Sequence, residues 1–317
     1  MMLKNSYLYS FNYDYHNNAL CKLESRQIFN KEQNNKVLFS NIEIDPSISP
    51  FIKNRVQLIT SSGNYQQLLT IIKSKNIINE EFTVEYLILP NDITPFEERR
   101  EKSKDIGYRI EGQPNFNTPK ITYSICKHHD IYYFGILTKH NIDWLKHKQK
   151  PCSFSNSINM DIAKSLVYIA TKGDKTNKLL DACCGVGTVM LEACISGFQI
   201  DGCDINAKSC IHTEKNLNYY NYSSKVYCSD IQNLSKQYDA AIIDLPYNLY
   251  SYSNDLIISN IINSTAKLAD RVIIVSISDI QIMINEAGLQ VIDYCTVEKR
   301  GKSKFSRKIW VCEKTLP

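Results

Sequence analysis

The chain has 317 residues, a length that accommodates two domains. Its formal net charge is +4, a mild basic excess that permits nucleic-acid binding without requiring it. The eleven cysteines include no C-x-x-C pair, which argues against a disulfide framework and against a zinc site. We therefore expect a cytoplasmic protein with reduced thiols, no signal peptide, no membrane span and no bound metal.

Residues 1–138 mix strand-like and helix-like segments. Short apolar or alternating stretches predict strands, and longer stretches with the helical period predict helices. The predicted strands are 7–13, 54–60, 82–89, 120–126 and 130–138, and the predicted helices are 64–76 and 94–108. We expect an α+β module over residues 1–138, followed by a basic, polar linker at 139–153.

From residue 154 to residue 317 short apolar strands alternate with helices. The predicted strands are 178–184, 198–204, 225–230, 238–244, 271–277, 289–299 and 307–314, and the predicted helices are 160–170, 187–197, 207–220, 255–269 and 279–288. This alternation is typical of an α/β fold with a seven-stranded, mostly parallel, doubly wound sheet. The two consecutive strands at the end predict a terminal antiparallel hairpin.

A glycine-rich turn follows the first strand of this second half, in the sequence D-A-C-C-G-V-G-T beginning at Asp181. Gly185 and Gly187 let the backbone approach a ligand and leave helix N–H groups pointing at it. The dinucleotide pattern G-x-G-x-x-G is not completed, because Met190 occupies the third glycine position. The turn therefore favours a nucleoside smaller than a dinucleotide.

The next three strands also end in aspartates, at Asp204, Asp230 and Asp244. Aspartates at strand ends also serve as caps and turn formers, but four in succession favour a ligand site. A carboxylate at Asp204 can accept hydrogen bonds from both hydroxyl groups of a ribose. Asp230 can accept a hydrogen from an adenine amino group, while Ile231 packs on the ring.

The fourth strand ends in Asp244, Leu245, Pro246 and Tyr247. The amino group of a nucleobase is a poor nucleophile, so its hydrogens must be held while a new bond forms. Asp244 and the backbone carbonyl of Leu245 can accept these two hydrogens. Pro246 stiffens the turn, and Tyr247 can stack on the base. The developing positive charge is stabilised by the carboxylate and the carbonyl dipole.

This arrangement resembles the S-adenosylmethionine-dependent methyltransferase fold, a Rossmann-like sheet. The resemblance implies that Asp181, Cys183, Gly185 and Gly187 line the methionine end of the cofactor. It likewise implies that Asp204 with Ile205 holds the ribose and that Asp230 with Ile231 binds the adenine. The four residues from Asp244 resemble the (D/N)-P-P-(Y/F) motif of amino-methyltransferases, with leucine in place of the first proline.

The segments G-Y-R-I-E-G at 107–112, W-L-K-H-K-Q-K-P at 144–151 and D-A-C-C-G-V-G-T at 181–188 resemble the THUMP-associated tRNA guanine-N2 methyltransferases, as a bacterial-type member. The resemblance implies methylation of a guanosine N2 in tRNA, at position 10 in preference to position 6, with one or two methyl groups. It also implies that residues 1–138 form a THUMP-like RNA-binding module. We expect a monomer, and no activator subunit is evident from the sequence.

Basic residues in the linker and the terminal hairpin are candidate phosphate contacts. They are Lys146, Lys148, Lys150, Arg300, Lys302, Lys304 and Arg307. Two alternatives remain open from the sequence. One is a DNA methyltransferase acting on adenine N6 or cytosine N4, and the other is a catalytically silent RNA-binding protein.

Overall fold

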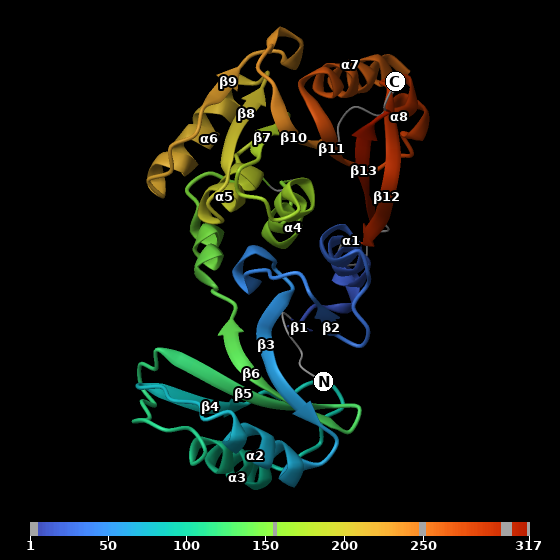
Figure 1. The fold of residues 1–317 in the computed structure, drawn as a ribbon. Helices are drawn as coiled ribbons and strands as arrows, with labels where there is room; N and C mark the ends of the chain where they lie inside the picture. The colour runs from blue at the N-terminus through green and yellow to red at the C-terminus, as the bar shows by residue number, and fades with distance from the viewer. Residues whose placement is uncertain (1–5, 155–156, 247–251, 299–305, 316–317) are drawn as a thin grey trace. The chain divides into compact units, whose positions relative to one another are not determined.

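The computed structural model describes residues 6–154, 157–246, 252–298 and 306–315, with only the backbone for 252–254. The chain divides into two compact units (Figure 1). Unit 1 comprises residues 1–12, 33–47 and 51–141, and unit 2 comprises residues 13–32, 48–50 and 142–317.

Unit 1 is built on a six-stranded sheet in the order β2-β1-β3-β6-β5-β4. Neighbouring strands are antiparallel except for β4 and β5, which are parallel. The strands are β1 (Tyr7–Phe11), β2 (Val37–Ser40), β3 (Ile52–Ser62), β4 (Phe82–Tyr86), β5 (Ile121–His128) and β6 (Ile131–Lys139). Strand β2 was not predicted, because its four residues are too few to show a period.

Two helices, α2 (Tyr65–Ser74) and α3 (Phe96–Gly107), lie against one face of this sheet (Figure 1). Leu68 and Ile72 of α2 and Ile106 of α3 pack in one apolar cluster with side chains of β5 and β6. A second cluster includes Val56 and Leu58 of β3. Burial of such side chains contributes about 1.5–3 kcal/mol each, which makes unit 1 a folded body with its own core.

Unit 2 is built on a seven-stranded sheet in the order β12-β13-β11-β10-β7-β8-β9. All neighbours are parallel except that β13 runs antiparallel to β11 and β12. The strands are β7 (Lys178–Asp181), β8 (Gln199–Asp204), β9 (Val226–Cys228), β10 (Tyr238–Asp244), β11 (Ala269–Ser276), β12 (Leu289–Glu298) and β13 (Ser306–Lys314). The predicted α/β sheet, mostly parallel and with a terminal antiparallel hairpin, is confirmed.

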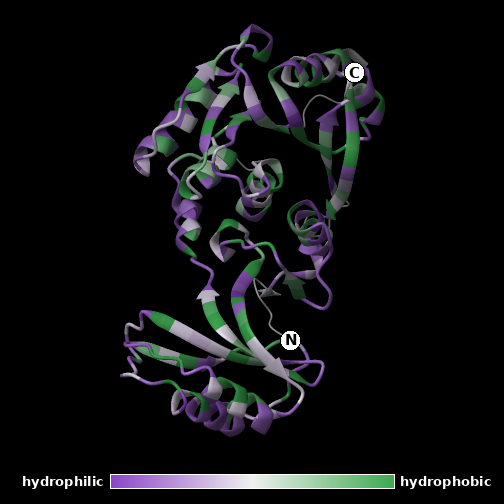
Figure 2. Cartoon of the chain, in the orientation of Figure 1, coloured by the Kyte–Doolittle hydropathy of each residue, from purple (hydrophilic) through white to green (hydrophobic). Residues whose placement is uncertain are grey.

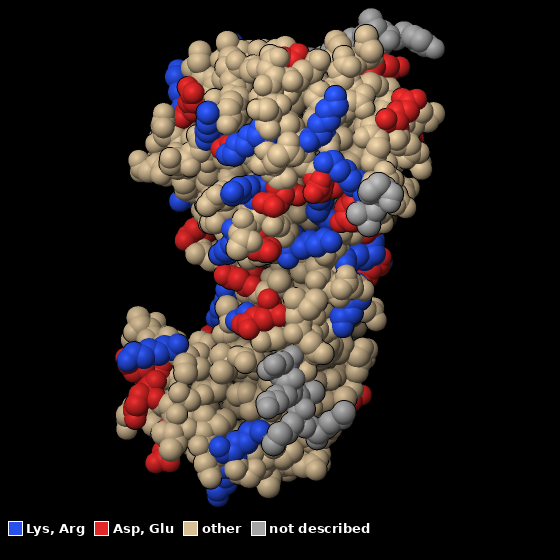
Figure 3. Space-filling model, turned by 45° about the horizontal axis from the view of Figure 1, so that its top comes forward, with Lys and Arg blue, Asp and Glu red and all other residues tan. Residues whose placement is uncertain are grey.

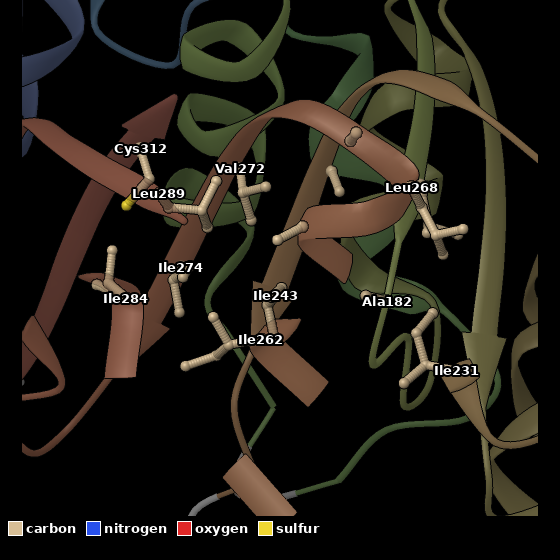
Figure 4. Packing of buried hydrophobic residues seen from close by; sticks show 14 of the residues in the cluster. Ala182, Ile231, Ile243, Ile262, Leu268, Val272, Ile274, Ile284, Leu289 and Cys312 are labelled. Carbon is tan, nitrogen blue, oxygen red and sulfur yellow. The ribbon is translucent and has the colours of Figure 1, made fainter. Parts of the chain in front are cut away.

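Strand β10 shows why both faces of this sheet are covered. Ala241 and Ile243 pack in a cluster with Ile262, and the intervening Ile242 is equally buried (Figure 4). Since successive side chains point to opposite faces of a strand, the burial of four successive residues, 240–243, requires a layer on each face.

The helices supply these two layers. Helix α4 contacts α5, α1 and strand β10, while α7 contacts α8 and strand β11. Their bounds are α1 (Asn18–Phe29), α4 (Met160–Thr171), α5 (Thr188–Ile195), α6 (Ala207–Tyr219), α7 (Tyr252–Leu268) and α8 (Gln281–Glu286). Figure 2 shows hydrophobic and hydrophilic residues mixed along the helices, as expected for elements that bury one side. Short 3-10 helices occur at η1 (Tyr15–Asn17), η2 (Pro46–Ile48), η3 (Asp143–Gln149) and η4 (Ile231–Asn233).

The structure divides the chain differently from the predicted boundaries of 1–138, 139–153 and 154–317. Helix α1, which was not predicted, belongs to unit 2 although it lies between β1 and β2 in the sequence. Arg26 of α1 donates from Nε and Nη2 to the Asp293 carboxylate on β12, at 2.9 and 2.8 Å. The predicted linker is also part of unit 2 from residue 142 onward, and it forms η3.

The surface of the protein carries charges of both signs. Figure 3 shows Lys and Arg side chains intermixed with Asp and Glu over the visible face, in keeping with the small net charge. Among the described residues, no helix combines the length and apolar character that crossing a membrane requires.

Candidate active site

Four neighbouring strands of unit 2 end in or near a carboxylate. Asp181, Asp204 and Asp244 are the last residues of β7, β8 and β10, and Asp230 follows β9. The sheet order β10-β7-β8-β9 makes these parallel strands consecutive neighbours. The structure therefore brings the four predicted aspartates to one carboxyl edge, where doubly wound sheets bind ligands.

The carboxyl group of Asp181 is at the centre of this edge and is only 2 % exposed. Burial raises its pKa well above the ordinary value, and the charges of Asp244 and Asp204 raise it further. A hydrogen bond from the backbone of Cys183 opposes this rise. Carboxylates held together in a poorly solvated site are relieved by a positively charged ligand.

The glycine-rich turn after β7 is fixed by backbone hydrogen bonds to neighbouring strands. Ala182 N donates to Ile242 O at 2.9 Å, and Cys184 N donates to Cys203 O at 3.0 Å. Gly185 has a φ of 56° and open space where a Cβ would be. The turn thus offers a backbone surface that a ligand can approach closely.

Gly187 is required for a different reason. Its φ is 76°, and a Cβ there would lie 2.8 Å from Thr213 Cγ2 on α6. Thr213 Oγ1 also donates to Gly185 O at 2.9 Å, so the helix and the turn are in direct contact.

Asp204 is positioned by two backbone donors. Gly185 N donates to its Oδ2 at 2.9 Å and Asn206 N donates to its Oδ1 at 2.8 Å. Burial raises the pKa of Asp204, and these two hydrogen bonds oppose the rise. Each carboxylate oxygen has a second lone pair, so Asp204 retains capacity for ligand hydroxyl groups. The adjacent Ile205 side chain is 74 % exposed.

The third strand end differs from the simple prediction. Asp230 caps η4, because its Oδ1 accepts from Gln232 N at 3.0 Å. The Ile231 side chain is 6 % exposed and belongs to the apolar cluster beneath the edge. Ile231 therefore supports this part of the edge from below and leaves little of its own surface for a ligand.

The fourth strand end is anchored through Leu245. Its backbone N donates to Val275 O on β11 at 3.1 Å, and its side chain is 2 % exposed in the apolar cluster. A leucine at this position is explained by that burial. Pro246 is exposed beyond it, and the predicted Tyr247 lies outside the described residues.

The sequence reasoning missed Asn216 of α6, which is fully buried. Its Nδ2 donates to Cys152 O at 2.9 Å and to Val186 O at 2.8 Å, while its Oδ1 accepts from Cys152 N at 2.9 Å. One amide thus joins the segment before α4 to the glycine-rich turn. A single asparagine in a helix carries no local pattern that would have identified this role.

The predicted phosphate contacts are placed in different ways. Lys150 Nζ donates to Thr188 Oγ1 at 2.8 Å, and burial lowers the pKa of Lys150. Lys148, Lys150 and the buried Arg307 line a cavity of about 550 Å³ beside the start of α4. Lys146 Nζ lies 5.8 Å from the ring centre of Tyr220. Arg300, Lys302 and Lys304 lie outside the described residues.

Comparisons with known proteins find similar sequences and a similar fold. The UPF0020 family, described as "RMKL-like, methyltransferase domain", matches residues 148–255. A curated relative, tRNA (guanine(10)-N2)-dimethyltransferase of Methanothermobacter thermautotrophicus, is 26 % identical over 119 residues, which is 36 % of this chain. The chain spans about a third of the length of that relative, namely 35 %.

Two solved structures were compared with this chain. TrmN from Thermus thermophilus has a TM-score of 0.51 at 12 % identity, covering 98 % of this chain and 100 % of that one. A putative RNA methyltransferase from Pyrococcus horikoshii has a TM-score of 0.46 at 14 % identity, covering 55 % of this chain and 96 % of that one. The first of these supports the methyltransferase fold expected from the sequence.

The resemblance to the tRNA guanine-N2 methyltransferases is thus confirmed as a similarity of sequence and fold. Residues 148–255 match the RMKL-like methyltransferase domain family, and they contain β7 to β10, whose carboxyl edge carries the four aspartates.

Proposed function

We propose that this protein transfers a methyl group from S-adenosylmethionine to the exocyclic N2 of a guanosine in tRNA, at position 10 in preference to position 6. The observation that carries the proposal is the convergence of Asp181, Asp204 and Asp244 at the carboxyl edge of a methyltransferase sheet. The name of the curated relative supports guanine N2 and position 10.

The residues at this edge fit S-adenosylmethionine. That molecule carries an ammonium group and a sulfonium group, and both are attracted by the clustered carboxylates. Gly185 leaves the open space that a ligand needs against the turn, and Asp204 has lone pairs for ribose hydroxyl groups. Asp230 and the exposed Ile205 are available for the adenosine, whereas Ile231 contributes from beneath.

When bound, S-adenosylmethionine would supply an electrophilic methyl group. The protein has to present the guanine amino nitrogen, whose lone pair is delocalised into the ring. Asp244 would accept one amino hydrogen and the Leu245 carbonyl the other, which favours a tetrahedral nitrogen and stabilises its developing positive charge. The hydrogen bond from Leu245 N to Val275 and the burial of its side chain hold this carbonyl in a fixed direction.

Recognition of tRNA would involve both units. We infer that unit 1 supplies the THUMP-like RNA-binding function expected for residues 1–138. Lys146, Lys148 and Arg307 of unit 2 would contact phosphates, together with the predicted Arg300, Lys302 and Lys304. Lys150 is bound to Thr188, so its first role would be to fix the segment before α4.

The decisive experiment is nucleoside mass spectrometry of tRNA from cells with and without the gene, mapped to position. We expect N2-methylated guanosine at position 10 to be absent from the tRNA of cells that lack the gene. It should form when that tRNA is incubated with purified protein and methyl donor. Label transferred to DNA and not to tRNA would contradict the proposal.

Replacement of Asp244 tests the catalytic assignment. We expect Asp244→Ala to lower kcat by a factor on the order of 100–1000, because a group that stabilises transition-state charge is removed. Binding of S-adenosylmethionine, measured by calorimetry, should persist. Asp270→Ala is the control, since Asp270 is an exposed carboxylate of the same sheet that pairs with Lys314. Equal activity of the two variants would refute the assignment.

A further inference from the structure

Unit 1 contains a groove that the proposed chemistry does not use. It lies between β4, which is the edge strand of the sheet, and helix α3, and it is closed by the segment 108–116. We call it the aromatic groove. Its volume is about 890 Å³, which is within the range of natural ligand sites.

Three aromatic side chains at the groove are exposed far more than a core role would allow. Phe96 is 65 % exposed, Tyr108 is 76 % exposed and Phe116 is 79 % exposed. The floor beneath them includes Val84 and Ile110. Exposed rings gathered over an apolar floor are a recognised mark of an interaction site.

The charged groups of the lining are mainly cationic. Arg99, Arg100 and Lys104 are contributed by α3. The carboxylate Glu85 also belongs to the lining, but it accepts from Lys139 Nζ at 2.8 Å and is thereby neutralised. The groove therefore favours an anionic occupant.

Two of the cations lie over the aromatic rings. The Arg99 guanidinium carbon lies 5.7 Å from the Phe96 ring centre, and Lys104 Nζ lies 5.6 Å from that of Tyr108. Within the part of the chain that the structure describes, Arg99 Nε is shielded from solvent and has no hydrogen-bond partner. A buried donor without a partner is costly, and an incoming acceptor oxygen would satisfy it.

A groove lined by both rings and cations suits a chain that carries both bases and phosphates. Bases stack on aromatic rings without regard to sequence, while cations contact the backbone. An acidic peptide would use the cations but would leave three exposed rings without planar partners. A regular duplex would hide its bases from the rings.

We propose that the aromatic groove binds a single-stranded segment of RNA, with bases stacked on Phe96, Tyr108 and Phe116 and phosphates at Arg99, Arg100 and Lys104. That this RNA is the substrate rests on the proposed function. The binding itself is a property of unit 1, so the two can fail separately.

The test measures fluorescence anisotropy of a labelled single-stranded RNA octamer of mixed sequence with the full-length protein and no methyl donor. We expect Tyr108→Ala and Phe116→Ala each to weaken binding on the order of tenfold. Tyr15→Ala is the matched control, because Tyr15 is 86 % exposed and lies in unit 2. Equal binding by all three variants, or equal weakening, would overturn the proposal.

A second arm tests the cations. Arg100→Gln and Lys104→Gln should each reduce the dependence of log affinity on log salt by about 0.7, the value for one phosphate contact on a single strand. Lys73→Gln, an exposed lysine of α2, should leave that slope unchanged. Tighter binding of a blunt RNA duplex, or of an Asp-rich peptide, than of the octamer would overturn the assignment of a single strand.

Octamer binding and tRNA methylation are measured separately, so this inference and the proposed function can fail independently. We expect Asp270→Ala, whose carboxylate is exposed and pairs with Lys314, to bind the octamer as the unchanged protein does. Groove-dependent binding without any tRNA methylation would leave the inference standing and refute the proposed function. Normal methylation with an unchanged KM for tRNA in Tyr108→Ala and Phe116→Ala would refute the role of the groove in substrate binding.

Discussion

At the scale of single residues, the burial of the Asp181 carboxyl group lowers the stability of the ligand-free fold and favours binding of a cationic ligand. Its carboxyl group is buried near Asp244 and Asp204, and its pKa is raised by burial first and by their charges second. A raised pKa in the folded state means that ionisation destabilises the fold. This cost is absent below the ordinary pKa of about 3.9 and grows as the pH rises through the folded pKa.

We therefore expect Asp181→Asn to increase the free energy of unfolding of the ligand-free protein at neutral pH, by about 0.5–2 kcal/mol. The gain should shrink as the pH is lowered to about 3.9 and below, because the carboxyl group of Asp181 then becomes protonated in the unfolded state as well as in the folded state. Affinity for S-adenosylmethionine should fall on the order of tenfold or more, because a charged partner is lost. Denaturant unfolding from pH 3 to 8 and calorimetric titration check both effects.

Asp239→Asn is the control for this prediction. Asp239 is an exposed carboxylate of β10 that accepts from Lys178 N at 2.7 Å, an acceptor role that asparagine can also fill. Its replacement should change neither stability nor cofactor affinity appreciably. A loss of stability in Asp181→Asn at neutral pH would contradict our account of the buried carboxyl group.

The two glycines of the turn are expected to respond differently to alanine. Both have positive φ, which costs an alanine about 1–2 kcal/mol. Gly185→Ala should lose only this amount of stability, because no atom lies where the new Cβ would be. It should weaken cofactor binding, because the Cβ would occupy the open space of the turn. Gly187→Ala should lose about 1–3 kcal/mol more, since its Cβ collides with Thr213. Unfolding and binding curves of both variants test the order, and the reverse order would contradict it.

At the scale of elements, helix α1 is held on unit 2 by Asp293. Burial acts to raise the pKa of Asp293, but hydrogen bonds from Arg26 and Gln27 bring it below the ordinary value. A lowered pKa in the folded state gives stability above the ordinary pKa of about 3.9 that is lost as the pH falls through the folded pKa.

We expect Arg26→Ala to reduce the free energy of unfolding by about 1–3 kcal/mol at pH 7, because Asp293 loses two charge-assisted hydrogen bonds. The difference from the unchanged protein should narrow as the pH falls below about 4. Lys22→Ala on the same helix removes only a surface pair with Glu32 and should cost less than about 1 kcal/mol. Equal losses in the two variants, measured by urea unfolding, would count against this anchoring.

At the scale of the whole molecule, the chain passes between its two units several times before residue 142. Helix α1 and the short segment 48–50 lie within the predicted N-terminal module, residues 1–138, but they belong to unit 2 in the structure. Helix α1 buries Leu20, Leu23 and Ile28, a helical pattern visible in the sequence. Its partner strand β12 is far away along the chain, and periodicity alone does not name the surface on which a helix packs.

The sequence by itself determined the features that depend on local order. Strands and helices alternate because their periods are local, and the glycine-rich turn and the four aspartates follow directly from where the strands end. Only the tertiary structure decided which of these side chains are exposed to solvent and which are buried in the core. Ile231 and Leu245 are buried by α7 and its neighbours, Lys150 is bound by Thr188, and Asn216 joins two segments distant in sequence. These outcomes depend on contacts between residues far apart in the chain, and the packing of the folded unit selects them.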